Sequence, residues 1–396
     1  MREMKDSGIA WIGAMPRAWK MNTIAQIFLQ VKCKNTGLQE KNLLSLSYGK
    51  VKRKSIDTVE GLLPESFDGY NIIEKDDIVL RLTDLQNDHT SLRVGLAEER
   101  GIITSAYLTI RNRSNFCPKY LYYYLHSFDI VKGFYGMGAG VRQGLNWDGI
   151  KWLKILAPSV PEQERIAAFL DAECAEIDTV LEKTRASIEE YKKLKQAVIT
   201  QAVTKGIRGD RPMKGSGIEW IGEIPAGIPI SRVGLHFDIV LGKMLCSAPV
   251  DDNYTLESYY CAADVHFEGL SNGEKKKMWF SPDEKEQYCV KNGDLLVVEG
   301  GAGAGGCAIA ASTDVPIYIQ NSIMIVRSKG ISNIRYLRYL LECLVKKGYI
   351  DVVCNKATIP HFTKDKLANV PFIVFSQSEQ EEIAEYLNES VLVLML

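Results

Sequence analysis

The sequence predicts an α/β (α+β) chain in which two tandem, pseudo-repeated globular domains are separated by a long coiled-coil helix. Two short motifs each occur twice, in the same order and in nearly the same register. After the first copy of the second motif comes a long stretch without glycine or proline, which is typical of an uninterrupted helix. A chain of 396 residues is also long for one compact domain, so two globular units are expected.

The first motif opens each half of the chain. S-G-I-A-W-I-G-A-M-P at residues 7–16 recurs as S-G-I-E-W-I-G-E-I-P at residues 216–225, with seven of ten positions identical. The second motif, P-E-Q-E-R-I-A at residues 161–167, is echoed by S-E-Q-E-E-I-A at residues 378–384. Two motifs in one register indicate a tandem duplication. Trp11 and Trp220 of the opening motif are predicted to be packing anchors.

Between the motifs the two halves keep a pattern but lose identity. D-I-V-L at residues 77–80 aligns with D-L-L-V at 294–297, and K-Y-L at 119–121 with R-Y-L at 335–337. Apolar runs bounded by Gly, Asn and Asp predict strands at 43–48, 78–82, 107–110, 295–298 and 323–326, and short helices are predicted at 119–127 and 333–345. Each half is therefore expected to be a mixed α/β globule that presents its own surface on a shared scaffold.

The segment after Pro161 predicts one helix over residues 161–205, about 65 Å long at about 1.5 Å per residue. Apolar residues at alternating steps of three and four form a heptad seam. Its main members are Leu170, Ile177, Leu181, Ile188, Tyr191 and Val198. The seam favours a two-helix coiled coil over the alternative, a core helix of a large domain.

Charge is distributed unevenly, although the formal net charge is only −1. Residues 20–158 carry 19 Lys plus Arg against 14 Asp plus Glu, and residues 226–378 carry 16 of each. The helix at 161–204 carries nine acidic and six basic residues, so it is not expected to lie along phosphates. The first domain has the basic surplus that suits a polyanion, and the second does not.

Nine scattered cysteines without a Cys-x-x-Cys pair predict reduced core thiols of a cytoplasmic protein, rather than disulfides or a zinc site. No apolar run approaches the roughly 18 residues that a membrane span needs.

These features together resemble the specificity (S) subunit family of type I restriction-modification enzymes, over essentially the whole chain. In that family each divergent region is a target recognition domain that reads one half of a bipartite DNA site, and the long helices set the spacing. The resemblance implies recognition domains at 1–160 and 206–377, a spacer helix at 161–205 and a truncated second spacer helix at 378–396. One departure is that Trp19 has Ile228 as its counterpart, and the short second helix is another.

The resemblance implies a non-catalytic, DNA-binding subunit of a cytoplasmic host-defence complex, without a cofactor or metal of its own. Its expected partners are double-stranded DNA, DNA methylation (modification) subunits and, in the full complex, restriction subunits. The alternative is a truncated or decayed subunit that acts only as a coiled-coil scaffold for methylation subunits. A standalone enzyme ranks third.

Two basic clusters are the first candidates for contact with DNA: Lys50, Lys52, Arg53 and Lys54 in the first domain, and Lys275, Lys276 and Lys277 in the second. Lysines there would neutralise phosphates, and Arg53 could bind guanine O6 and N7. A solvated turn is the alternative for each.

Two loops before short helices form the second group of candidates. G-A-G-V-R-Q-G at residues 138–144 corresponds to N-K-A-T-I-P-H at 355–361. Matching loops with unmatched polar residues suit different base contacts, which selects Arg142, Gln143, Lys356, Thr358 and His361. An ordinary surface turn is again the alternative.

Enzyme signatures are missing. G-A-G-A-G-G at residues 301–306 satisfies Gly-x-Gly-x-x-Gly, but residues 315–320 predict a strand where a dinucleotide site needs a helix. Neither an Asn-Pro-Pro-Tyr-like tetrapeptide nor a P-loop occurs, and the five histidines are far apart. Catalysis by this chain is therefore not expected.

Overall fold

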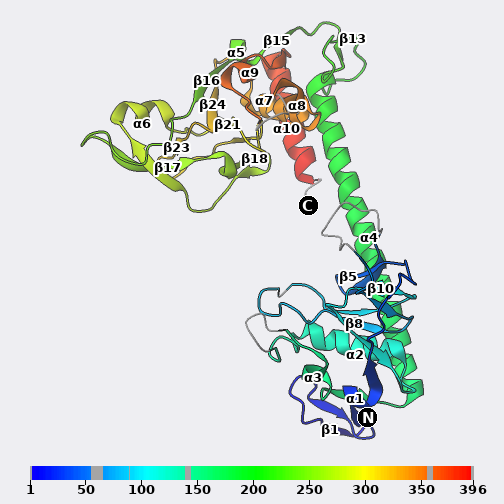
Figure 1. The fold of residues 1–396 in the computed structure, drawn as a ribbon. Coiled ribbons are helices and arrows are strands. Elements are labelled where there is room, and N and C mark those ends of the chain that lie inside the picture. Colours follow the sequence, from blue (N-terminus) through cyan, green and yellow to red (C-terminus); the bar gives the residue numbers. More distant parts are fainter. Residues whose placement is uncertain (1, 55–65, 89, 139–143, 355–359, 394–396) are drawn as a thin grey trace. The chain divides into compact units, whose positions relative to one another are not determined.

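The structure is a computed structural model that describes residues 2–54, 66–88, 90–138, 144–354 and 360–393. The chain divides into two compact units, Met1–Glu182 and Lys183–Leu396. The division lies inside the long helix α4 (Val160–Lys205), so each unit contains one part of that helix (Figure 1). The mixed helix and strand fold with a long helix confirms the predicted fold class.

The first unit is built mainly from short strands and one longer helix. In chain order its elements are β1 (Met4–Asp6), β2 (Ala14–Pro16), β3 (Lys20–Thr23), α1 (Ile24–Ile27), β4 (Phe28–Gln30), β5 (Leu44–Ser47), β6 (Lys50–Arg53), β7 (Asn71–Ile73), β8 (Ile78–Leu80), β9 (Val94–Leu96), β10 (Gly101–Ile103), β11 (Leu108–Asn112), α2 (Pro118–Ile130), α3 (Trp147–Ile150), β12 (Lys154–Ala157) and the start of α4.

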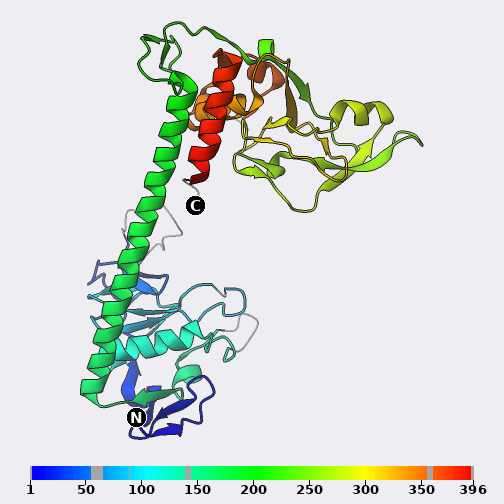
Figure 2. The ribbon, with the colours of Figure 1, turned by 180° about the vertical axis from the view of Figure 1, so that it is seen from behind.

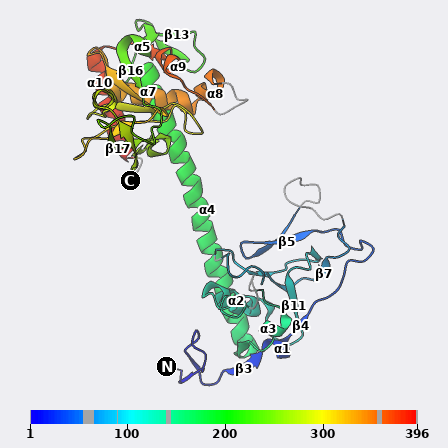
Figure 3. The same ribbon diagram turned by 60° about the vertical axis from the view of Figure 1, so that its left-hand side comes forward.

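An antiparallel sheet in the order β4-β11-β8-β9 forms the centre of the first unit (Figure 3). Successive side chains of a strand point to opposite faces, so Ile78 and Leu80 belong to the core under α2. Val79 belongs instead to a smaller core with Leu44 and Ile103 from the flanking hairpins. The sheet is therefore covered on both faces, which explains the fully apolar strand β8.

The second unit repeats this element order and adds an insertion. After the end of α4 come β13 (Met213–Gly215), β14 (Glu223–Pro225), β15 (Ile230–Arg232), α5 (Val233–His236), β16 (Phe237–Leu241), β17 (Thr255–Tyr260), the 3₁₀ turn η1 (Ala262–Asp264), β18 (Val265–His266), β19 (Gly269–Leu270), β20 (Lys276–Phe280), α6 (Pro282–Tyr288), β21 (Leu295–Val298), β22 (Cys307–Ile309), β23 (Tyr318–Ile319), β24 (Ile323–Ser328), α7 (Ile334–Lys346), α8 (Tyr349–Val353), α9 (Lys364–Ala368), β25 (Pro371–Ile373) and α10 (Gln377–Val393).

The two units share one sheet topology. The sheet β16-β24-β21-β22 has the order of β4-β11-β8-β9, and the pair β15-β25 matches the pair β3-β12. The pair β17-β20 corresponds to β5-β6, and the parallel contact of β17 with β23 corresponds to the parallel bridge between Leu43 and Ile102. The β18-β19 hairpin and helix α6 distinguish the second unit. The duplication seen in the sequence is thus a duplication of the fold.

The two ends of α4 pack on different partners. Near the start of α4, Ala167 is buried in the core of the first unit. Near its end, Ile199, Ala202 and Val203 are buried in the main core of the second unit. Ile383 and Leu387 of α10 belong to that same core, and α10 lies beside the end of α4 (Figures 1 and 2). The helix is one residue longer at its start than predicted.

The middle of the α4 seam is exposed among the described residues. Ile177, Leu181, Ile188 and Tyr191 are 58%, 48%, 48% and 55% exposed, whereas Leu170 and Val198 toward the ends are half-buried. The predicted coiled coil therefore stays a prediction about a partner helix along this segment.

Other sequence predictions can be compared with the structure directly. The predicted helices at 119–127 and 333–345 are confirmed as α2 and α7. The predicted strand at 315–320 is present but shorter, as β23 at Tyr318–Ile319, with an isolated bridge from Gln320 to Lys243. All nine cysteines are free, but the prediction of core thiols is wrong for Cys33 and Cys174, which are exposed. Within the described chain, none of the helices has the length and apolarity to cross a membrane.

Candidate nucleic-acid interface

A buried carboxylate and an arginine fasten the central sheet in both units. Asp77 precedes β8 and accepts two hydrogen bonds of 2.7 Å from Arg111 of β11. Asp294 precedes β21 and accepts bonds of 2.8 and 2.6 Å from Arg327 of β24. Both carboxylates are nearly fully buried, and their bonds raise the pKa of each arginine. This duplicated pair fixes the strands that carry the candidate loops.

The β5-β6 hairpin positions the first basic cluster. Its turn consists of Tyr48 and Gly49 alone, with φ values of 48° and 76°. Two positive φ values in a two-residue loop define a type I′ turn, which matches the twist of the strands. Tyr48 is 83% exposed at the tip, and Lys50 and Lys52 are exposed on β6. The hairpin thus presents a basic strand with an aromatic tip.

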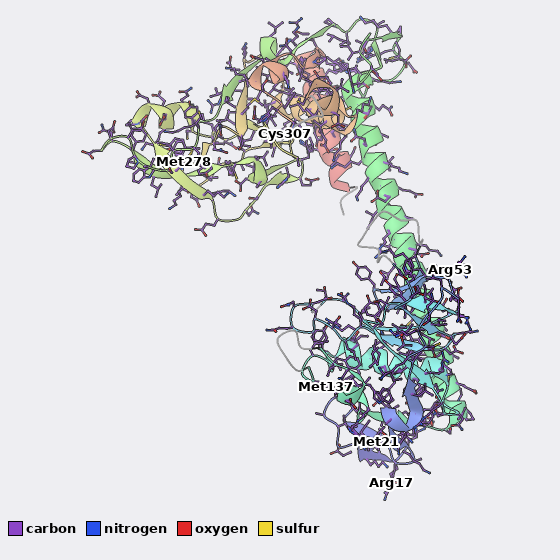
Figure 4. The ribbon with its side chains drawn as sticks, in the orientation of Figure 1. Arg17, Met21, Arg53, Met137, Met278 and Cys307 are labelled. Atoms are coloured by element: carbon purple, nitrogen blue, oxygen red, sulfur yellow. The ribbon has the colours of Figure 1, made fainter. Side chains whose placement is uncertain are left out.

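Arg53 is already held by a carboxylate. Its guanidinium forms a two-pronged interaction with Glu99, with Nε donating at 2.6 Å and Nη2 donating to the second oxygen. This contact lowers the pKa of Glu99 and raises that of Arg53. Arg53 is nevertheless largely exposed at the surface of the first unit (Figure 4). Because exposed ion pairs stabilise a fold little, a base or phosphate could replace Glu99 at small cost.

His126 of α2 lies directly beneath the Tyr48-Gly49 turn. A Cβ atom at Gly49 would lie 3.1 Å from Leu92 Cβ and 3.3 Å from the His126 ring, and the φ of 76° also favours glycine there. Burial lowers the pKa of His126, and the negative charge of Asp129 opposes that shift. The Nδ1 atom has no hydrogen-bond partner in the structure. Protonation of this ring therefore disfavours the folded first unit.

The stability of the first unit is expected to fall as the pH drops below about 6.5, because the unfolded chain then binds a proton that buried His126 resists. Replacing His126 with glutamine should reduce this loss between about pH 7.5 and 5.5. Hydrogen-exchange protection of α2 measures the effect in the first unit alone. His266→Gln, at an exposed site in the second unit, is the control, and an unchanged pH dependence in His126→Gln would contradict the expectation.

The second basic cluster separates into one buried and two exposed lysines. The Lys275 ammonium donates to Asp264 Oδ1 at 3.1 Å and to Ser271 and Gly273, and its side chain is 10% exposed. These bonds hold the turn before β20 together. Lys276 and Lys277 are therefore the members of this cluster that remain candidates for contact with DNA. Both of these are exposed on β20, the edge strand that carries Met278 (Figure 4).

The loops of the second candidate group are only partly described. Arg142, Gln143, Lys356 and Thr358 lie outside the described residues. His361 is described: its side chain is 61% exposed and its Nδ1 lies 3.4 Å from Glu299 Oε2. It pairs with Gly300, so it adjoins the glycine-rich loop at residues 300–306. The strand β22 follows that loop, whereas a dinucleotide-binding Gly-x-Gly-x-x-Gly loop is followed by a helix.

Two buried cations were missed by reasoning from sequence. Arg93 is fully buried in the first unit, and Lys243 is largely buried in the second. Lys243 pairs with Glu284 and lies 4.9 Å from the Tyr254 ring centre. Neither residue was selected from the sequence, because no local pattern marks a charge that distant groups will bury. Among the described residues, no cluster of acidic, histidine and cysteine side chains could hold a metal ion.

The fold and its sites can be compared with known proteins. Residues 268–391 match the family model described as the type I restriction modification DNA specificity domain. The matched residues make up much of the second unit, so this part of the chain is similar to that specificity domain. The first unit, which lies outside the match, has the same order of strands in its central sheet and the corresponding Asp–Arg pair, Asp77 with Arg111.

Two solved structures resemble this chain over nearly its whole length. One comes from a study of complex assembly and conformational transition of the type I R-M system, with 18% identity, a TM-score of 0.70 and coverage of 96% of this chain and 92% of that chain. The other is the HsdS subunit from Thermoanaerobacter tengcongensis, with 16% identity, a TM-score of 0.55 and coverage of 96% and 91%. At these identities the likeness concerns the fold. A search of curated protein sequences finds no match.

Proposed function

We propose that this chain is the DNA-specificity subunit of a type I restriction-modification complex, and that each unit recognises one half of a bipartite site. The observation that carries the proposal is the duplicated scaffold with different surfaces. Both units hold the same sheet with the same buried Asp–Arg pair. At the corresponding place in the chain order, the first unit has the β5-β6 hairpin with exposed Lys50 and Lys52, and the second has the longer β17-β20 pair with β18 and β19 between its strands. Different surfaces on one scaffold suit an asymmetric site.

The chain itself performs no chemistry under this proposal. Methylation and restriction subunits supply the S-adenosylmethionine and ATP reactions in the cytoplasm, and this chain directs them to the site. Lys50, Lys52, Lys276 and Lys277 are exposed and suit contacts with phosphates. Neutralising phosphates releases counterions, so binding should weaken steeply as salt increases.

The test is to co-express the chain with the methylation subunit of its own system and map adenine methylation by long-read sequencing. One bipartite motif that appears only with this chain supports the proposal. The methylation subunit alone and the chain alone are the controls. Absence of methylation by a folded chain that co-purifies with the methylation subunit would contradict it.

A second candidate function is a coiled-coil scaffold for methylation subunits without productive DNA recognition. The exposed apolar seam at Ile177, Leu181 and Ile188 favours this candidate, because apolar side chains at heptad spacing need a partner helix. The two candidates differ in one measurement. A scaffold retains methylation subunits but produces no sequence motif in the methylation map.

Replacing Arg53 with alanine is expected to relax specificity at one base position, at a cost of about 1 to 3 kcal/mol in binding, if the guanidinium recognises guanine. Binding to duplexes that differ at single positions measures this. Arg100→Ala is a matched control, since Arg100 is another exposed arginine with carboxylate partners, Glu40 and Glu74. A uniform loss over all sequences would make Arg53 a phosphate contact instead.

A further inference from the structure

The loop between β8 and β9, residues 81–93, occupies a distinctive place in the first unit. Its Leu82 carbonyl accepts a hydrogen bond of 2.8 Å from the amide of Leu145, directly after the 138–144 candidate loop. In the second unit the matching β21-β22 loop makes the same contact, from Phe362 N to Glu299 O at 2.6 Å. Each hairpin loop thus adjoins one of the two candidate loops selected from the sequence.

A buried guanidinium organises the β8-β9 loop. Arg93 is fully buried, and its Nη1 donates to the backbone carbonyls of Arg81 and Thr83 at 3.0 and 2.8 Å. Its Nη2 donates to the carbonyls of Asp84 and Asp88 at 3.3 and 2.5 Å. Burying a charge is costly unless its donors are satisfied, and here the loop's own carbonyl groups satisfy them. The guanidinium thereby fixes the path of the loop.

Hydrogen bonds within the loop hold its polar side chains, and among them Asn87 Nδ2 donates to Asp84 Oδ1 at 2.9 Å. Asp88 Oδ1 accepts from the backbone amides of Ser91 and Thr90 at 2.9 and 3.3 Å. The Ser91 side chain, followed by these backbone amides, holds the pKa of Asp88 well below its usual range. Gln86 and Asn87 at the tip are exposed. Carboxamides can bind a base edge in the major groove with two hydrogen bonds, most often that of adenine. A rigid loop tipped with carboxamides is suited to base recognition.

The matching loop of the second unit is built without such a clamp. Residues 299–306 are held by backbone bonds, among them Gly305 N to Val298 O at 2.9 Å and Gly306 N to Gly303 O at 2.9 Å. Gly301 and Gly305 have φ values of 89° and 81°, which favour glycine. This loop has no long side chain at its tip. The two units therefore differ in chemistry at the same place on the shared scaffold.

We propose that the β8-β9 loop recognises bases in the half-site of the first unit, with Gln86 and Asn87 as specificity-determining residues and Arg93 as their positioning residue. This inference rests on the proposed function, because it assigns the recognition to one loop. It commits to double-stranded DNA as the ligand and to base edges, rather than phosphates, as the atoms contacted.

The experiment is a binding selection from a random duplex DNA library with the full chain in complex with its methylation subunit, followed by sequencing. Gln86→Ala and Asn87→Ala should each reduce the preference at one or two base positions of one half-site by about five- to 150-fold. The other half-site in the same molecule is the internal control. Gln39→Ala changes another exposed glutamine of the first unit, outside the loop, and should leave the motif unchanged.

The Arg93→Gln variant tests whether Arg93 positions Gln86 and Asn87. It should relax the same base positions as the two tip variants and leave the second half-site intact, whereas misfolding of the first unit would remove its half-site entirely. Gln86→Ala and Asn87→Ala, at exposed positions, keep the proposal testable even if Arg93→Gln does not fold. An unchanged motif in both tip variants overturns this inference alone. A wild-type complex that enriches no motif overturns both this inference and the proposed function.

Discussion

Replacing Arg327 with methionine is expected to destabilise the second unit by about 2 to 4 kcal/mol. The change leaves Asp294, 5% exposed, as an uncompensated charge beneath the sheet, and it also removes a bond of 2.9 Å to the Cys289 carbonyl. This loss of stability is smaller than that expected for a fully buried ion pair, because the Arg327 side chain is itself 29% exposed. Hydrogen exchange of α7 as a function of urea concentration measures the effect in this unit.

A double variant separates charge from packing. In Asp294→Asn/Arg327→Met the amide oxygen can still accept the bond from Lys291 N, but no charge remains buried. Stability should recover in large part, because a neutral group costs less to bury than an unpaired carboxylate. Arg111→Met is the matched change in the first unit and should leave α7 unaffected. An Arg327→Met protein as stable as the wild type would contradict the assigned role of the pair.

Replacing Gln380 with leucine is expected to cost about 2 to 4 kcal/mol, because two buried backbone groups lose their partners. The Gln380 carboxamide accepts from Asn333 N and donates to Phe375 O, both at 2.8 Å, and so joins the starts of α10 and α7. Gln163 does the same for α4 and α2, with bonds of 2.9 Å to Cys117 N and Pro158 O. Gln163→Leu should therefore destabilise the first unit by a similar amount.

Gln196→Leu is the control for both glutamine changes. Gln196 lies on α4, is half-buried and makes a bond of 3.3 Å to the Thr200 hydroxyl, so its loss should cost well under 1 kcal/mol. Urea unfolding followed by unit-resolved hydrogen exchange compares the three variants. Equal stability of Gln380→Leu and Gln196→Leu would show that the buried carboxamide is dispensable.

The shared scaffold could be predicted from sequence because its signals are local. The opening motif carries two glycines at positive φ, Gly8 and Gly13 in the first copy, and a serine whose hydroxyl accepts from the amide two residues later. Trp11 packs on Tyr124 and Trp220 packs on Tyr349, with 5.4 Å between the ring centroids in each pair. Both tryptophans therefore act as packing anchors, as predicted. Turn residues, apolar runs and a proline at a helix start are all properties of neighbouring positions.

The candidate interface was harder to predict because its cations are distinguished by distant groups. Lys275 and Lys276 are adjacent in sequence, yet Asp264 and Ser271 bury the first while the second is exposed. Arg93 stands in an apolar strand context, and only the return of the loop carbonyls reveals its role. The alignment of Asp77 with Asp294 did contain a usable signal, since each has an arginine in the matching later strand.

Each unit also brings its opening segment back to the start of its own helix. Arg2 forms an ion pair with Glu162, and Arg211 forms the equivalent pair with Glu379 at 2.7 Å. The first residues of each unit therefore lie beside the helix that follows its last strand, and the same type of Arg–Glu ion pair joins them in both units. In the gene, each unit is thus a segment bounded by the same two repeated motifs. Recombination between its two repeated motifs would exchange one unit for another and keep both ion pairs at the junction. Under the proposed function, such an exchange would combine half-sites in new pairs without point mutation.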